Sequence, residues 1–241
     1  MRGMILVARR ELAAYFNSYW GWVVIAVILL IDGLLFNAVA MGDKPKYSSE
    51  VIEQFFWVSF GCTVIASLPV TMRLFAEEKQ TGTMVLLDSA PLSRWQLVGG
   101  KYASAMLVMA VLVLSTLYMP ALVFVNGKVS YGHIFAGYLG LMLVAAAATG
   151  VGTLGSAIAR NQIVAFIISA LLLAFLVLAW LLAKVTDPPL QDVISYLSFY
   201  DRHFRGFGEG KVSSESVVFF LSVAFVSLLG SSRFLAARRW Q

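Results

Sequence analysis

The sequence predicts an all-α integral membrane protein with six transmembrane helices, on the strength of three observations. Hydrophobic residues make up 60% of the 241 residues and charged residues only 13%, whereas soluble domains carry roughly 45–50% and about 25%. So few charged residues cannot cover the outside of a soluble protein of this size, so lipid must solvate much of the surface. Six apolar runs reach the ~20 residues that a helix needs to cross a bilayer. The run at residues 163–183 lacks the period-two alternation of a barrel strand.

Six predicted spans follow one another along the chain, at residues 19–40, 55–76, 102–125, 131–157, 163–183 and 217–237. Helices suit them because every backbone polar group in lipid must be paired locally. Pro69 lies in the second span and Pro120 near the end of the third. We expect each proline to bend its helix rather than end it, since neighbouring helices can satisfy the freed carbonyl groups.

The basic residues predict the orientation of the chain. With the N-terminus in the cytoplasm, the inner segments hold eleven basic and four acidic residues, and the outer segments hold seven basic and eight acidic residues. Lys and Arg accumulate in cytoplasmic loops. Both termini of this six-span chain are therefore expected in the cytoplasm.

Residues 1–18 are too polar to span the membrane. Apolar side chains recur there at helical spacing, with Arg2, Arg9 and Arg10 among them. This pattern predicts a helix that lies in the cytoplasmic interface. The alternative is an ordinary basic anchor before the first span.

The segment 77–100 between the second and third spans is patterned, and it exceeds the usual 2–8 residues or so of a tight helix–helix connection. Gly82 and Thr83 can end one helix and begin a short one with an apolar side. Pro91 ends that short helix, and Ser93 with Gln96 forms a capping box for the next. Such a helix suits docking into a groove of a soluble partner. The alternative is a helix that lies on the lipid surface and contacts no partner.

The same segment resembles the type-2 ABC (ATP-binding cassette) exporter permeases, and more narrowly the short permeases associated with bacterial gliding motility. The resemblance is carried by residues 73–83, 86–87, 90–93 and 100–101, and by further stretches at 8–12, 160–162, 204–210 and 238–240. In that family an E-E-x-x-x-G-T run begins the coupling helix, and Glu77, Glu78, Gly82 and Thr83 match it. Val85 stands where many relatives carry an acidic residue.

The resemblance implies one permease domain over residues 1–241 and two contacts with an ATPase. The residues that it assigns to this coupling are Arg73, Glu77, Glu78, Lys79, Gly82, Thr83, Leu86, Leu87 and Pro91 in the first contact, and Arg160, Asn161 and Gln162 in the second. It further implies that two permeases, identical or related, pair in the bacterial cytoplasmic membrane and export a substrate across it. The chain has no GxxxxGK[ST] phosphate-binding loop. ATP and Mg are therefore expected in a separate nucleotide-binding subunit, and we expect no cofactor and no enzymatic activity in this chain.

Asp32 lies within the first predicted span. An ionisable group at the centre of the bilayer costs about 2.5–3.5 kcal/mol on insertion scales, so it should face protein or a wet cavity. One interpretation places Asp32 on a transport path or at a permease–permease interface. The other places it near the outer boundary, where it is paired or reaches the headgroups.

Two other regions are interpreted from their composition. Small residues at 145–156 in the fourth span let helix backbones approach closely, within the chain or across a dimer, and a substrate role is the less favoured interpretation.

The composition of residues 185–215 predicts one or two short amphipathic helices in the outer leaflet. The resemblance makes them a re-entrant outer gate, with Phe199, Tyr200 and Phe204 as candidates. The alternative is an aromatic belt that anchors the chain.

Other functions are weaker interpretations of the sequence. A membrane-embedded enzyme would need clustered catalytic groups at membrane depth, where Asp32 stands alone. Cys62 and the two histidines lack metal-ligand spacing, and the charge distribution gives no reason to expect nucleic acid. A scaffold that anchors an envelope or gliding-motility complex, with no transport of its own, remains the alternative to a permease.

Overall fold

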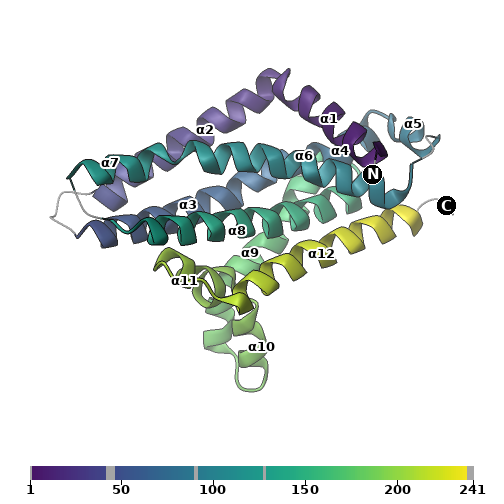
Figure 1. Cartoon of the computed structure of the whole chain (residues 1–241). Coiled ribbons are helices and arrows are strands. Elements are labelled where there is room, and N and C mark those ends of the chain that lie inside the picture. The colour runs from purple at the N-terminus through teal and green to yellow at the C-terminus, as the bar shows by residue number, and fades with distance from the viewer. Residues whose placement is uncertain (1, 42–46, 90–91, 127–128, 238–241) are drawn as a thin grey trace.

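A computed structural model describes residues 2–41, 47–89, 92–126 and 129–237. Within these ranges every regular element is a helix (Figure 1). The elements are α1 (Arg2–Phe16), α2 (Tyr19–Leu35), η1 (Phe36–Met41), α3 (Ser48–Thr71), α4 (Arg73–Gln80), α5 (Met84–Ser89), α6 (Arg94–Ser115), α7 (Tyr118–Asn126), α8 (Tyr131–Ile158), α9 (Gln162–Val185), α10 (Leu190–Tyr196), η2 (Phe199–Phe204), α11 (Arg205–Gly208) and α12 (Ser214–Ala237).

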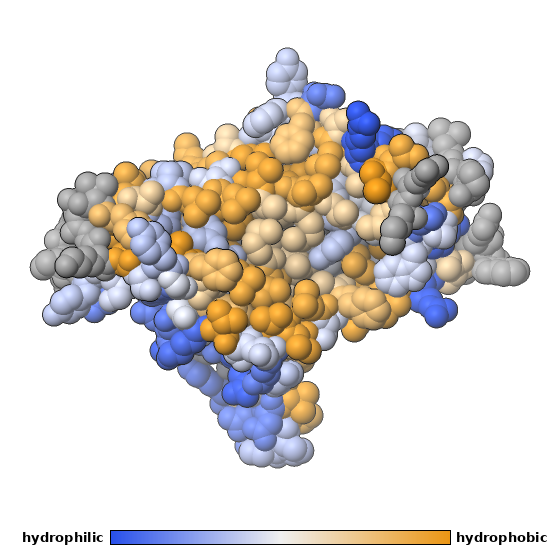
Figure 2. Space-filling view, viewed as in Figure 1, coloured by the Kyte–Doolittle hydropathy of each residue, from blue (hydrophilic) through white to orange (hydrophobic). Residues whose placement is uncertain are grey.

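Six helical stretches in the described part of the chain are long and apolar enough to cross a membrane. They are Tyr19–Met41, Ser48–Gln80, Arg94–Phe124, Tyr131–Ile158, Gln162–Val185 and Ser214–Ala237. Apolar residues cover the middle of the bundle on the face shown in Figure 2, and hydrophilic residues gather on the projection around α10. The prediction of an all-α protein that crosses the membrane six times is confirmed. The start of α1 and the end of α12 lie at the same end of the bundle (Figure 1).

Helix α8 forms the centre of the bundle, because its small residues let neighbouring helices come close. A Cβ atom on Gly152 would lie 2.1 Å from Oγ1 of Thr71 in α3. One on Gly150 would lie 2.9 Å from the Cα atom of Ala224 in α12. The small residues of the fourth span therefore pack within the chain.

The third span is interrupted near its C-terminal end. Helix α6 ends at Ser115 and α7 begins at Tyr118, so Pro120 does more than bend one continuous helix, and that expectation is wrong. A proline at position i has no N–H to donate to the carbonyl of residue i−4, and its ring clashes with that carbonyl. Residue i−4 of Pro120 is Thr116, where the helix is interrupted. Helix α3, in contrast, continues through Pro69.

Helix α1 meets α2 at a bend and packs along the start of α6 (Figure 1). Gly100 permits this contact, since a Cβ atom there would lie 2.8 Å from the carbonyl oxygen of Met4. Val7 is buried, whereas Ile5 and Leu6 are exposed. The predicted helix near the N-terminus is present, and its place in the membrane interface stays a prediction.

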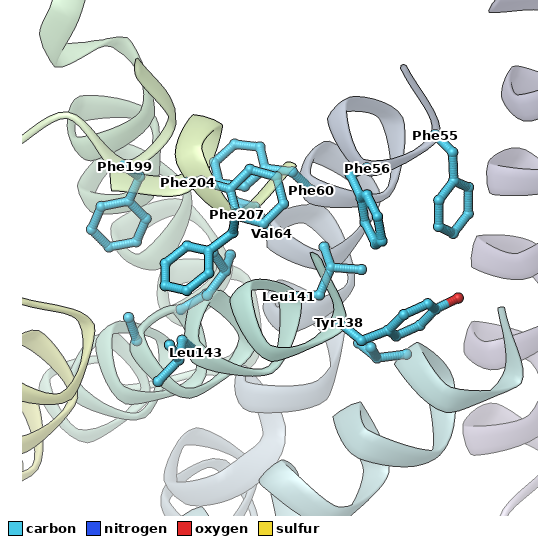
Figure 3. Close-up of a cluster of buried hydrophobic side chains, with 14 of the residues drawn as sticks. Phe55, Phe56, Phe60, Val64, Tyr138, Leu141, Leu143, Phe199, Phe204 and Phe207 are labelled. Atoms are coloured by element: carbon cyan, nitrogen blue, oxygen red, sulfur yellow. The ribbon is translucent and has the colours of Figure 1, made fainter. Parts of the chain in front are cut away.

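The segment between α9 and α12 folds into α10, η2 and α11. Phe199, Phe204 and Phe207 point from η2 and α11 into an aromatic core with residues of α3 and α8 (Figure 3). The rings of Phe60 and Phe204 lie 4.8 Å apart between centroids. Burial of these aromatic side chains holds the segment against the bundle.

Candidate functional site

Helices α4 and α5 form the segment that the sequence singles out between the second and third spans. Helix α4 ends at Gln80, and Gly82 has φ +74°, a backbone conformation that other residues rarely adopt. Ser93 and Gln96 form the predicted capping box at the start of α6. The predicted helix break at Gly82 and the predicted start of the next helix are both confirmed.

Four charged side chains join α1, α4 and α6 at the base of this segment. Oε1 of Glu11 accepts from Nη2 of Arg10 at 2.6 Å and from Nζ of Lys101 at 2.9 Å. Oε1 of Glu78 lies 2.9 Å from each of the same two nitrogens. We call these four residues the ionic cluster.

Burial makes the ionic cluster different from a surface salt bridge. The Lys101 side chain is 1% exposed, and that of Glu78 is 15% exposed. Removing one partner from a buried ion pair leaves a charge without compensation, which typically costs about 3–5 kcal/mol. The cluster therefore fixes α1 and α4 against α6.

Protonation of Glu11 would weaken this cluster. Burial raises the pKa of Glu11, but Lys101 and Arg10 outweigh that effect and bring the pKa below its ordinary value. A carboxylate with a lowered pKa stabilises the folded state above its unfolded-state pKa. That stabilisation is lost as the pH falls through the lowered pKa, so the pairs that Glu11 makes with Arg10 and Lys101 persist at neutral pH.

The remaining acidic residue of α4 points to a different partner. Arg73 donates to both carboxylate oxygens of Glu77, at 2.7 and 3.1 Å, within α4 itself. The Glu77 side chain is 37% exposed. Glu77 thus stiffens α4 and is open to the surroundings, whereas Glu78 faces the interior.

Helix α4 is also attached to the end of α8. Oγ of Ser156 accepts from the backbone N–H groups of Phe75 and Ala76, at 3.0 and 3.2 Å. These groups belong to the first turn of α4, which has no carbonyl partners within its own helix. The Ser156 hydroxyl in turn donates to the carbonyl oxygen of Met72 at 3.2 Å.

Lys79 completes this attachment at the other end of α4. Its Nζ donates to the carbonyl oxygens of Ala157 and, at 3.0 Å, Ala159. These carbonyls directly precede the turn that contains Arg160, Asn161 and Gln162. The structure therefore brings the two predicted contact regions together, although they lie about 80 positions apart.

The turn itself is shaped by Asn161. Its side-chain oxygen accepts from the backbone N–H of Val164 at 2.8 Å and caps α9. Arg160 is exposed beside it. Of the other predicted residues, Thr83 and Leu87 line a cavity between α1 and α6. Leu86 lies in α5, but its side chain, like the whole of Pro91, falls outside the described residues.

Sequence reasoning gave no role to four residues that organise this site: Arg10, Glu11, Lys101 and Ser156. The first three occur in stretches that carry the resemblance, yet nothing in the sequence indicates that they meet. A lysine at the start of an apolar run, such as Lys101, is the one local signal of a buried ion pair.

Asp32 is buried within the chain, with 2% of its surface exposed. Oγ of Ser59 in α3 lies 3.1 and 3.2 Å from its two carboxylate oxygens. Asp32 therefore has a hydrogen-bond partner inside the bundle. Its place on a transport path or at a permease–permease interface, and the alternative place near the outer boundary, both stay predictions.

We expect Ser59→Ala to destabilise the bundle by about 1–3 kcal/mol, because it leaves a buried carboxyl group without its hydroxyl partner. Thermal unfolding of the purified chain in detergent measures this effect. Ser115→Ala is the matched control, since the Ser115 hydroxyl is exposed and bonds only to the carbonyl of Val111 in its own helix. Equal melting temperatures for the two variants would contradict the assigned pairing.

The outer candidates lie in the aromatic core described above. Phe199 and Phe204 are fully buried, and Tyr200 is half-buried with its ring 5.3 Å from that of Phe60. Tyr200 and Phe204 pack on Phe60 of α3, whereas the ring of Phe199 packs on Phe219 and Phe220 of α12. Their role as a gate stays a prediction.

Among the described residues no group of three or more His, Cys, Asp and Glu side chains could hold a metal ion.

Comparisons with known proteins identify the family. A family model described as "ABC-2 family transporter protein" matches residues 36–200, which is more than half of the chain. No curated protein matches the chain. With six membrane-crossing helices and this match, the chain belongs to the ABC-2 transporter family, as a permease component of an ABC transporter.

Proposed function

We propose that this permease is the membrane subunit of an ATP-driven exporter, docked on a separate nucleotide-binding subunit through α4, α5 and the α8–α9 turn. The observation that carries the proposal is the attachment of α4 to the end of α8 through Lys79 and Ser156. It makes one surface out of two segments that are distant in sequence. ATP and Mg bind in the partner subunit, because the chain has no phosphate-binding loop.

The connections of α4 suggest how the motion of a partner would reach the membrane. Helix α4 follows α3 after a single intervening residue, Met72, so a tilt of α4 acts directly on the second span. The ionic cluster transmits the same tilt to α1 and α6. Movement of packed helices as rigid bodies is a common way of switching between conformations.

The finer assignments belong to the same proposal. The permease pairs with a second copy or a related permease in the bacterial cytoplasmic membrane, with both termini in the cytoplasm, and it is a member of the gliding-motility subfamily. Asp32, Phe199, Tyr200 and Phe204 are the candidates for the transport path or its outer gate. Their support is burial of an ionisable group at membrane depth and an aromatic segment packed across α3 and α8.

Gly82→Val tests the docking role. A β-branched residue at φ +74° is strained, so the α4–α5 turn must change direction. No other atom lies within 4 Å of a Cβ atom placed on Gly82, so the substitution clashes with nothing. We expect stimulation of the partner's ATPase activity by the permease to fall by about tenfold, the equivalent of 1.4 kcal/mol of coupling, while the six spans remain folded.

Gly61→Val is the matched control for this experiment. Gly61 lies in α3, where a Cβ atom also has open space around it, but its φ is that of an ordinary helical residue. The complex of permease and ATPase is purified from cells, and ATP hydrolysis is measured in nanodiscs. If the Gly82 variant stimulates hydrolysis as well as the Gly61 variant does, the docking role is wrong.

A membrane scaffold without transport of its own is the second candidate. It shares the docking surface but undergoes no change driven by ATP. Protease protection of residues 77–100 in the complex, with and without ATP, separates the two functions. A cleavage pattern that ignores ATP would favour the scaffold.

A further inference from the structure

An open cavity of about 770 Å³ lies between α1, α4, α5 and α6. Its volume falls in the range of roughly 300–1,000 Å³ that is typical of small-molecule sites. The ionic cluster lies on its wall, together with Tyr15, Arg73 and Glu77. The cavity shares residues such as Thr83 and Leu87 with the docking segment, but the docking proposal assigns no ligand to it.

The walls of the cavity change from polar to apolar along α6. Lys101 lines the end near the ionic cluster, and Ala105 and Val108 line the cavity further into the third span. Seven residues of helix separate Lys101 from Val108, a rise of about 10 Å. Val70 of α3 and Leu74 of α4 add apolar side chains to the lining. The cavity thus has a charged end and an apolar end, as an amphiphilic ligand requires.

Arg10 is the charged group that the cavity presents most openly. Its side chain is 54% exposed, more than any other ionisable group of the lining for which the structure gives a salt bridge. Its Nη2 pairs with the carboxylates of Glu11 and Glu78, which are only 19% and 15% exposed. The other N–H groups of this more exposed guanidinium can meet a headgroup, and guanidinium groups bind phosphate through paired hydrogen bonds.

In the proposed topology, the outer face of α1 places the cavity against lipid. Ile5 and Leu6 are exposed there, next to the charged end. An exposed apolar face on a basic helix is typical of helices that lie in the membrane interface. Acyl chains of the same leaflet would reach the cavity along this face.

We infer that the cavity binds one anionic phospholipid, with its phosphate on Arg10 and an acyl chain between α1 and α6. The inference rests on the proposed topology, in which α1 lies at the cytoplasmic face. The bound lipid supports α1 against α4, so the composition of the inner leaflet acts on the segment that docks the ATPase. Because this lipid contacts the permease alone, its binding is measured without a nucleotide-binding subunit.

Native mass spectrometry of the purified full chain in neutral detergent tests the inference, with phosphatidylglycerol and phosphatidylcholine of identical acyl chains as probes. We expect phosphatidylglycerol to bind about tenfold more tightly, as a charge-assisted contact provides. Arg10→Gln should remove this preference, and Arg9→Gln should keep it, because Arg9 is an exposed neighbour on α1 that does not line the cavity. Excess inorganic phosphate should not displace the lipid.

A second substitution tests the place of the acyl chain. Ala105→Trp fills the apolar end and should weaken binding of both lipids, and Ala105→Leu serves the same purpose should the larger side chain prevent folding. Equal loss of preference in the Arg9 and Arg10 variants would overturn the site, as would full binding in a folded Ala105 variant. Displacement by phosphate alone would show an anion site that needs no acyl chain. If any of these results occurs together with normal ATPase stimulation, the docking role stands and the proposed lipid site is wrong.

Discussion

Glu78→Lys is expected to abolish stimulation of the partner's ATPase and to detach α1 from the start of α6. The substitution places a third cation beside Arg10 and Lys101 and leaves Glu11 as their only carboxylate in the ionic cluster. Lys101 is almost completely buried and cannot turn to water for solvation. Breaking a buried ion pair from one side costs about 3–5 kcal/mol, which is enough to separate the two helices.

Hydrogen exchange of α1, together with ATP hydrolysis by the assembled complex, measures both consequences. Glu77→Lys is the matched control, because Glu77 is the adjacent carboxylate of the same helix, is more exposed, and pairs with Arg73 alone. An exposed pair contributes about 0–1 kcal/mol, so Glu77→Lys should leave the hydrogen exchange of α1 unchanged, whatever it does at the docking surface. The double variant Glu78→Lys with Lys101→Glu restores opposite charges across α4 and α6 and should recover part of the protection of α1. Equal exchange of α1 in the two single variants would contradict the role of Glu78 in the ionic cluster.

Gly152→Leu is expected to disrupt the bundle strongly, because Gly152 is one of the tightly packed glycines of the fourth span. Even the Cβ atom would lie 2.1 Å from Oγ1 and 2.8 Å from Cβ of Thr71, which is itself fully buried. Overpacking a tight core costs typically 1–3 kcal/mol, and more where the backbone cannot shift. Because Thr71 ends α3 just before α4 begins, the clash should also displace the docking segment.

The melting temperature of the purified chain in detergent, together with its yield in membranes, measures this effect. Gly61→Leu serves as control, since a side chain on Gly61 has no neighbour within 4 Å of its Cβ atom. Both variants add the same apolar volume to a membrane helix, so a difference between them reports the contact with Thr71. Similar melting temperatures would mean that α3 and α8 do not approach as closely as described.

Features that depend on neighbouring residues in the sequence could be predicted. Apolar runs of sufficient length gave all six spans, because lipid imposes that length on any helix that crosses it. Gly82 predicted a helix break, and the Ser93–Gln96 pair predicted a helix start, because each of these signals lies within a few neighbouring residues. The effect of Pro120 on the helix was underestimated. A bend was expected, whereas the helix is interrupted one turn before the proline, at Thr116.

Features that depend on contacts between distant segments could not be predicted. Glu77 and Glu78 look alike in the sequence, yet one pairs within α4 and the other reaches α1 and α6. Lys79 and the end of α8 carry no signal of each other, because their bonds involve backbone carbonyls that every sequence has. The place of Asp32 was ambiguous for a related reason. Its depth in the membrane does not follow from the sequence, and its partner Ser59 is one of several serines within the predicted spans.

The bonds between α4 and the end of α8 have a practical consequence for hybrid proteins. The bonds depend on two side chains, Lys79 in α4 and Ser156 in α8, whose partners are backbone groups of the other helix. A chimera that receives residues 73–89 from a relative replaces the first of these side chains and keeps the second from the host, so bonds are lost where the relative lacks a lysine at position 79. Grafting the last turn of α8 together with the α4–α5 segment transfers both sides of this contact. These two segments together are the smallest unit by which such permeases could exchange their ATPase partners.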